Sequence, residues 1–453
     1  MVNIDDFFLM EKKHEFFQIK TNQGFPIWDI IRHHVWKKVY LSSLEQPNLI
    51  NSLKRPSFLF LAFNLLKYLA VFIKSLFIKN DILFIGFSRF RNPNNKLYDK
   101  FFKIVKETLS NQFSFCFYEI FINQKGYDET NRTYDIIPFL SKIFKISIVN
   151  KVIVENLSNN INNFYGKNII TAKEIQELLS SFYLEYVFYK FFIKIKKIKY
   201  VFLVSDFKAL CFAAKKSNVL TFEIQHGDIV KNTINYSYSL ECCEMNKDNF
   251  IFPKILFTYS SVWAKNNNFF SRCIELGIPH VNSECNISSV NNNIVIVSSP
   301  LHNDVLMNFA VILAQEQKQF TIYFKLHPMD GLNFDFFNNY FSKFKNILVV
   351  NGSDDIKYLL KISNHFIAIY STVMYEIYQA KKYLYIFKKQ DFQNFSDYFF
   401  LDRVSLFSDY NDFQIQLKCN MRTNINSFYS ATPCIFFKEF QPEILINSIN
   451  QAY

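Results

Sequence analysis

Five apolar runs recur at intervals between residues 294 and 387: IVIVS (294–298), FTIYFKL (320–326), ILVV (347–350), FIAIY (366–370) and YLYIF (383–387). The segments between these runs carry the apolar spacing of helices, near residues 304–315, 334–345, 354–362 and 372–381. Strict alternation of strand and helix predicts a parallel sheet with helices on both faces. The second half of the chain therefore reads as a complete doubly wound domain.

The first half of the chain repeats this alternation less strictly. It predicts strands at 81–87, 113–120, 200–204, 219–224 and 254–259, and helices at 98–109, 172–196 and 207–216. We therefore expect an α/β protein with Rossmann-like domains over 81–285 and 286–435, facing each other across a cleft. The polar stretch 280–293 is the predicted linker. A helical extension is expected over 1–80 and a closing helix within 436–453.

Length, composition and charge limit the class of protein. A chain of 453 residues suits two domains, and a hydrophobic content of 50% suits sizeable cores. The net charge of +12 favours anionic partners such as nucleotide sugars, lipid surfaces or nucleic acid, although a lysine-rich surface alone would also produce it. The 8 cysteines form no CxxC pair, and the N-terminus lacks the apolar core of a signal peptide. A reducing cytoplasmic location is expected.

One aromatic stretch, SFLFLAFNLLKYLAVFIKSLF at 57–77, could be mistaken for a membrane span. Lys67 lies at its centre, where a bilayer would oppose a charge. The sequence favours an amphipathic helix that lies on a membrane surface or packs on the protein, with a true span as the less favoured reading. A peripheral enzyme at the inner face of the cell membrane is expected.

The first strand end with unusual chemistry is Gln225-His226-Gly227-Asp228, after the run at 219–224. Ligands of open parallel sheets bind at the carboxyl ends of strands. His226 there can act as a general base or bind a phosphate, and the glycine indicates a sharp turn. A structural histidine satisfied by backbone is the alternative.

Two more strand ends lie in the second half. Lys325-Leu326-His327-Pro328 carries Gly331 downstream, and Tyr370-Ser371-Thr372 carries Glu376 one helical turn further on. Ser and Thr at a helix start can cap its free N–H groups, and the same groups can bind a phosphate. Plain N-capping is the alternative for the Ser-Thr pair taken alone; taken together with the histidine-bearing strand ends, it predicts a site for an anionic ligand.

Several common nucleotide motifs are absent. The chain contains no G-x-G-x-x-G, no G-x-x-x-x-G-K-[ST] and no Asp-x-Asp. Dinucleotide oxidoreductases and P-loop NTPases are therefore disfavoured. We expect metal-independent chemistry with no cofactor besides a sugar nucleotide, whose phosphate charge is neutralised by histidine, basic side chains and a helix dipole.

In their order and spacing, these motifs resemble those of bacterial surface-polysaccharide glycosyltransferases of the GT-B type, which build capsule or lipopolysaccharide. The likeness includes Tyr236 and an opening segment, Gly24-Phe25-Pro26-Ile27-Trp28 with Arg32. The His327-Pro328 and Ser371-Thr372 pairs further resemble motifs of bacterial sialyltransferases and Kdo transferases, which use CMP-sugars. A similar series occurs in teichoic-acid polymerases that use CDP-glycerol. The acidic-acidic-glycine base motif of some sialyltransferases has no clear match here.

The resemblance implies that His327, Ser371 and Thr372 hold the donor phosphate and that His226 is a candidate base. Our hypothesis places base and ribose near 325–331 and Glu376, and the acceptor beside Trp28, Arg32, Gln225 and Gly227. Asp206 and Asp228 are further candidates for the base, and a single displacement would invert the anomeric carbon. Two alternatives stay open: a CDP-polyol phosphotransferase, and a non-catalytic protein that binds nucleic acid or membranes.

Overall fold

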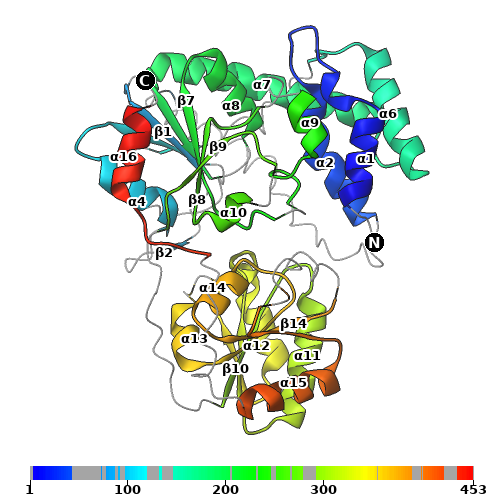
Figure 1. Cartoon of the computed structure of the whole chain (residues 1–453), viewed down its shortest axis with the longest axis vertical. Coiled ribbons are helices and arrows are strands. Elements are labelled where there is room, and N and C mark those ends of the chain that lie inside the picture. Colours follow the sequence, from blue (N-terminus) through cyan, green and yellow to red (C-terminus); the bar gives the residue numbers. More distant parts are fainter. Residues whose placement is uncertain are drawn as a thin grey trace. The chain divides into compact units, whose positions relative to one another are not determined.

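The computed structural model describes residues 4–42, 73, 78–86, 90–91, 97–119, 132–134, 146–204, 207–230, 233–245, 251–265, 268–278, 292–352, 354, 356–389, 399, 401–422 and 436–451. The chain forms two compact units (Figure 1). Unit 1 comprises Met1–Thr258, Ala264–Leu276 and Gln441–Tyr453, and unit 2 comprises Tyr259–Trp263 and Gly277–Phe440. Three features named above lie outside the described residues: Asp206, nearly all of the aromatic segment 57–77, and most of the predicted linker.

Unit 1 is built on a seven-stranded sheet of order β5-β4-β1-β6-β7-β8-β9. All neighbouring strands are parallel. The strands are β1 (Ile82–Gly86), β4 (Phe115–Glu119), β5 (Arg132–Tyr134), β6 (Tyr200–Leu203), β7 (Leu220–Ile224), β8 (Ile255–Thr258) and β9 (Arg272–Glu275). A short antiparallel pair, β2 (Phe90–Arg91) and β3 (Leu97–Tyr98), stands apart from this sheet.

The helices of unit 1 cover both faces of its sheet. They are α1 (Ile4–Lys13), η1 (Phe16–Gln18), α2 (Ile27–Leu41), α4 (Lys100–Leu109), α6 (Lys151–Tyr165), α7 (Ala172–Lys196), α8 (Lys208–Lys216), α9 (Leu240–Met245), α10 (Val262–Lys265, which straddles the unit boundary) and α16 (Pro442–Asn450). The long helix α7 begins with a capping box, because Thr171 and Glu174 satisfy each other's backbone N–H groups. The N-terminal helices α1 and α2 share one apolar core with β1, β4 and β6. The extension is therefore an integral layer of unit 1.

The other face of this sheet carries a row of phenylalanines. Phe84 stacks on Phe117 with ring centroids 4.9 Å apart, and Phe222 stacks on Phe202 at 4.8 Å and on Phe257 at 5.7 Å. The register pairs Phe84 with Phe117 and Phe202 with Phe222, so these rings lie side by side, whereas Phe257 lies two residues beyond the partner of Phe222 on the same face of β8. Part of the chain's phenylalanine content thus forms a structural layer across five strands.

Unit 2 contains a six-stranded, all-parallel sheet of order β12-β11-β10-β13-β14-β15. Its strands are β10 (Asn293–Val297), β11 (Thr321–Lys325), β12 (Ile347–Val350), β13 (His365–Ala368), β14 (Tyr383–Phe387) and β15 (Val404–Phe407). Its helices are α11 (Asn303–Glu316), η3 (Pro328–Asn333), α12 (Phe334–Phe341), α13 (Lys357–Ile362), α14 (Val373–Gln379) and α15 (Tyr410–Arg422). Helices α11, α12 and α15 share the apolar core on one face of the sheet.

Two doubly wound parallel-sheet units in one chain are the make-up of the GT-B fold, so the predicted fold class is confirmed. Apart from the helix favoured at 57–77, which lies almost entirely outside the described residues, the predicted strands and helices recur with ends shifted by a few positions. Several short or half-polar elements were not predicted, among them β2, β3, β5, β9, β15, α6, α9 and α15. Among the described residues, no helix is both long and apolar enough to cross a bilayer.

Candidate active site

The carboxyl edge of the unit 2 sheet gathers three strand ends around its topological switch point. Strand β10 lies between β11 and β13, with Val297 paired to Lys325 and Ile296 paired to Ile367. Neighbouring strands are about 4.8 Å apart, so the ends of β11 and β13 are separated by about 10 Å. The segment after β11 begins at His327, and the segment after β13 begins at Tyr370. Both therefore border the crevice at the switch point, where doubly wound sheets bind their ligands.

The loop that carries His327 is fixed by a buried serine. The His327 backbone N–H donates to Ser298 Oγ at 2.7 Å, and Ser298 Oγ donates to Asp330 Oδ2 at 3.2 Å. The Asp330 backbone N–H in turn donates to the His327 carbonyl at 2.8 Å. Ser298 and Asp330 are buried, whereas the His327 side chain is only half-buried. Sequence reasoning missed Ser298, although its position directly after a buried strand was a usable signal.

Pro328 follows His327 and begins the 3-10 helix η3, which also contains Gly331. Gly352, at the end of the neighbouring strand, makes room for this turn, since an added Cβ would lie 2.4 Å from the His327 carbonyl oxygen. Only glycine allows so close an approach between the two backbones. The half-exposed imidazole of His327 is thus presented on a rigid backbone at the sheet edge.

Lys325 has a structural position that differs from its predicted donor-binding role. Its ammonium is buried and donates to the carbonyl oxygens of Asn351 at 2.8 Å, Leu326 at 2.9 Å and Gly352 at 3.1 Å. A lysine ammonium has three N–H donors, so all are used by backbone. Lys325 therefore joins the ends of β11 and β12 and does not reach a ligand in this geometry.

The third strand end leads into α14. Thr372 occupies the N-cap position of α14 in a helical conformation (φ −60°), and its side chain caps no backbone N–H. Ser371 Oγ accepts from the Val373 N–H at a long 3.3 Å. Tyr370, Ser371 and Thr372 are partly exposed, as is Glu376 one turn later. Residues four apart share a helix face, so Thr372 and Glu376 lie on the same side of α14.

The carboxyl edge of unit 1 presents the second predicted group. Gln225 is buried: its backbone N–H donates to the Phe257 carbonyl at 2.9 Å, and its Nε2 donates to the Gly227 carbonyl at 2.8 Å. These two hydrogen bonds hold Gln225 in place and fix the start of the loop after β7. His226 is half-buried and Asp228 is buried.

The chain bends at Gly227, as the sequence predicts, but this bend does not require a glycine. Positive φ occurs among the described glycines at Gly24, Gly166 and Gly277, and a Cβ added at Gly227 would meet nothing within 4 Å. The backbone at this position is open to other residue types. The fold requires a glycine instead at Gly352, whose backbone lies against that of His327.

A buried hydrogen bond between two residues near His226 in the sequence was not predicted. Tyr236 donates its hydroxyl to Glu223 Oε1, and both residues are buried. Glu223 lies in β7 three residues before His226, while Tyr236 belongs to the loop that follows. A carboxylate inside the apolar run LTFEI was the available signal, because a buried charge requires a partner. This hydrogen bond ties the loop back to the strand.

Trp28 and Arg32, predicted to line the acceptor side, are buried in the core of unit 1. Arg32 pairs with Glu11 and donates from Nη2 to the Ser237 carbonyl at 3.0 Å and from Nη1 to the Ile234 carbonyl. Trp28 Nε1 donates to Glu11 Oε1 at 2.7 Å. Burial alone would lower the pKa of Arg32, but the contacting Glu11 carboxylate, together with Tyr238 and Asp29, outweighs burial and raises that pKa.

The N-terminal extension thus serves the His226 region indirectly. The Arg32 guanidinium also lies 3.9 Å from the centroid of the Tyr238 ring. Its fork of N–H donors joins the extension to the loop 234–238, which Tyr236 anchors to β7. Arg32 is a positioning residue for this loop.

No group of three or more His, Cys, Asp or Glu in the described part of the chain is arranged to hold a metal ion. The prediction that the edges of units 1 and 2 border one cleft stays a prediction. The residues gathered at the unit 2 edge are His327, Pro328, Gly331, Tyr370, Ser371, Thr372 and Glu376, and those at the unit 1 edge are Gln225, His226, Gly227 and Asp228.

No family model matches the sequence, and a search of curated proteins found no match. Solved structures of similar fold include a UDP-GlcNAc 2-epimerase from Methanocaldococcus jannaschii in complex with UDP-GlcNAc and UDP, 13% identical over 82% of this chain and 99% of that chain, with a TM-score of 0.47. MurG from Acinetobacter baumannii is 9% identical over 82% and 99%, with a TM-score of 0.45. The wall teichoic acid polymerase TagF is 11% identical over 87% and 97%, with a TM-score of 0.43. These likenesses are distant, and the assignment of the fold rests on the strand orders and registers described above.

Proposed function

We propose that this protein is a glycosyltransferase that moves a sugar from a nucleotide-activated donor to a growing surface polysaccharide or lipopolysaccharide. The observation that carries the proposal is the edge of unit 2, where the His327 loop and the Ser371-Thr372 segment flank the switch point of a doubly wound sheet. That is the position at which such sheets bind nucleotides.

The donor is held by unit 2. His327, half-buried on a backbone fixed by Ser298 and Asp330, supplies a hydrogen-bond donor for a phosphate oxygen. The Thr372 hydroxyl, which caps no helix N–H, supplies another. Glu376 on the same helix face accepts hydrogen bonds from ribose hydroxyls. The resemblance of His-Pro and Ser-Thr to the motifs of CMP-sugar transferases favours a CMP-sugar.

The reaction is a single displacement. A base on unit 1 takes the proton of the acceptor hydroxyl, the acceptor oxygen forms a bond to the anomeric carbon, and the bond to the nucleotide phosphate breaks with inversion. His226 and Asp228, which follow β7, are candidates for this base, and Asp206, which follows β6 in the sequence, is a third. No metal or other cofactor takes part, and the acceptor is a glycan or glycolipid beside the inner membrane surface.

A donor screen with the purified chain tests the proposal. The proposal predicts that CMP is released from a CMP-sugar when a glycan acceptor is present, that the product contains no donor phosphate, and that the new linkage is inverted. Release of CMP from CDP-glycerol with phosphate retained in the product would instead identify a polyol-phosphate transferase. Nucleic-acid binding that weakens with salt, with no donor consumed, would identify a non-catalytic protein.

A further inference from the structure

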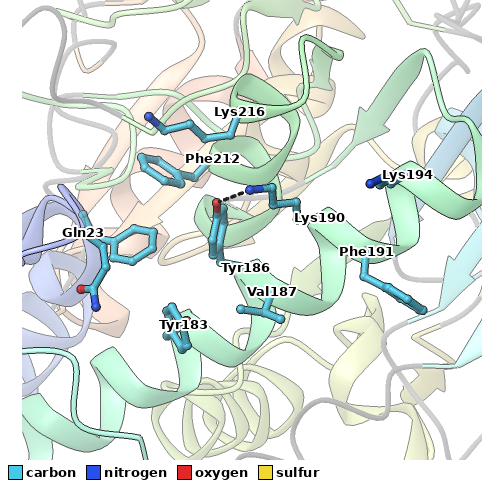
Figure 2. Close-up of a pocket in the computed structure, with 10 residues that line it drawn as sticks. Gln23, Tyr183, Tyr186, Val187, Lys190, Phe191, Lys194, Phe212 and Lys216 are labelled. Atoms are coloured by element: carbon cyan, nitrogen blue, oxygen red, sulfur yellow. Dashed lines mark hydrogen bonds between the residues drawn. The ribbon is translucent and has the colours of Figure 1, made fainter.

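A pocket of about 500 Å³ opens on unit 1 where α7 and α8 meet the turn before α2 (Figure 2). Its rim carries the lysines Lys190, Lys194 and Lys216, and none of its described lining residues is acidic. Lys194 and Lys216 lie in the last turns of helices that lead into β6 and β7. The pocket therefore lies toward the amino edge of the sheet, away from the carboxyl edge that carries His226.

The floor of the pocket is a fixed set of aromatic rings. The Phe25 ring lies 5.1 Å from the Tyr186 ring and 5.0 Å from the Phe212 ring. Lys190 Nζ donates to the Tyr186 hydroxyl at 3.3 Å, as the dashed line in Figure 2 marks, and Lys216 Nζ lies 5.5 Å from the Phe212 centroid. Both lysine stems thus run along apolar surface while their ammonium groups stay at the rim.

The exposed face of α7 beside the pocket is apolar. Val187 is 46% exposed, Phe191 is 51% exposed and Ile195 is 37% exposed. A spacing of four residues places these side chains along one face of the helix. The outward face of a surface helix is normally polar, so an apolar stripe flanked by lysines indicates an interaction surface.

The charge of this region is one-sided in the sequence as well. Between Tyr186 and Val219 the only acidic residue is Asp206. Some lysines of the region are used structurally, because Lys196 donates to Asn80 Oδ1 and Lys199 pairs with Asp81. The three rim lysines remain exposed and add to the positive surface around the apolar stripe.

We propose that this α7–α8 surface, defined by Lys190, Lys194, Lys216, Val187 and Phe191, docks on an anionic lipid bilayer. Phosphate headgroups would lie among the ammonium groups, and the apolar side chains would enter the boundary of the acyl chains. The inference deepens the membrane location proposed above and does not depend on the reaction.

The chemistry favours a bilayer over other occupants. In a two-fold dimer through this face, the same lysines would meet each other and repel. Nucleic acid would match the lysines and could stack on Phe191, but it would leave the aliphatic side chains of Val187 and Ile195 in water. A bilayer matches both features, since it presents anionic headgroups above an apolar layer.

Flotation of the full chain with lipid vesicles tests the inference. Vesicles of phosphatidylcholine with 30% phosphatidylglycerol are compared with phosphatidylcholine alone, at low and at high salt. The wild-type chain is expected to float with the anionic vesicles and to be released by salt. The triple variant Lys190→Glu, Lys194→Glu, Lys216→Glu is expected to partition on the order of a hundredfold more weakly.

Matched variants on unit 2 control for net charge and for apolar exposure. The control triple variant Lys318→Glu, Lys343→Glu, Lys361→Glu replaces three exposed lysines and changes the net charge by the same amount. It should leave flotation nearly unchanged. Phe191→Ser should weaken flotation severalfold, whereas Ile415→Ser, which alters a side chain that is 62% exposed on α15, should not. Circular dichroism confirms that each variant is folded.

The inference would be overturned if both triple variants lost flotation equally, or if the Lys190→Glu, Lys194→Glu, Lys216→Glu variant floated as the wild-type chain does. So would equal binding to neutral vesicles, or self-association through this face in the absence of lipid. Nucleotide release with a soluble acceptor is measured on the same proteins. Because that assay needs no vesicle, failure of the docking surface is distinguished from failure of the proposed reaction.

Discussion

Replacing Arg32 with methionine is expected to destabilise unit 1 by about 4 kcal/mol. The guanidinium is buried and donates to the Glu11 carboxylate and to the carbonyl oxygens of Ile234 and Ser237. Removing one member of a buried ion pair costs about 3–5 kcal/mol, because the other is left as an uncompensated charge. The two carbonyls that lose a donor add to this cost, whereas protonation of Glu11, whose pKa is raised by burial, reduces it.

A double-mutant cycle separates the ion pair from packing. The variant with both Arg32→Met and Glu11→Leu removes both charges, leaving mainly the Trp28 N–H and the two carbonyls without partners. Its expected cost is about 2 kcal/mol, which implies a coupling energy of a few kcal/mol. Urea unfolding followed by tryptophan fluorescence measures all four proteins. A cost below about 1 kcal/mol for the single variant, or strictly additive effects, would refute the reasoning.

Three further predictions follow from individual residues. Burial and the nearby Lys382 charge lower the pKa of His365 to about 4. As the pH falls, the unfolded chain therefore protonates this histidine at a higher pH than the folded protein does. Thermal unfolding should therefore show stability that is full above pH 6.5 and falls by about 1.4 kcal/mol per pH unit toward pH 4, a slope that His365→Gln should reduce. Gly352→Ala places a Cβ 2.4 Å from the His327 carbonyl oxygen and should lower kcat/KM for the donor severalfold, while Gly227→Ala, whose Cβ meets nothing within 4 Å, should not. Nucleotide release should be unchanged in excess EDTA, and a loss restored by a divalent cation would contradict the metal-independent mechanism.

The architecture could be predicted because buried parallel strands read as continuous apolar runs. ILVV at 347–350 and YLYIF at 383–387 match β12 and β14 residue for residue, and 172–196 matches α7. Strand ends in such a sheet fall at one edge, so His327 and Ser371 could be grouped before any coordinates. The half-polar edge strand RCIE of β9 lacks this pattern and was missed.

The roles of individual polar residues depended on contacts that sequence distance hides. Arg32 meets Ser237, which is 205 positions away, and so became a core residue instead of an acceptor contact. Lys325 lies within the expected strand, but its ammonium donates to carbonyls of the neighbouring strand end. The need for glycine likewise depends on a close backbone approach, which occurs at Gly352 and not at Gly227. None of these contacts has a local sequence signal.

Equilibrium binding of the donor nucleotide tests the central claim most directly. Titration calorimetry with CMP and a CMP-sugar compares the wild-type chain with His327→Ala, and with His14→Ala as a control histidine in unit 1. Because a charge-assisted hydrogen bond to phosphate contributes about 1.5–3 kcal/mol, His327→Ala should bind about 10- to 100-fold more weakly while His14→Ala binds as wild type does. Unchanged affinity in folded His327→Ala would contradict the account.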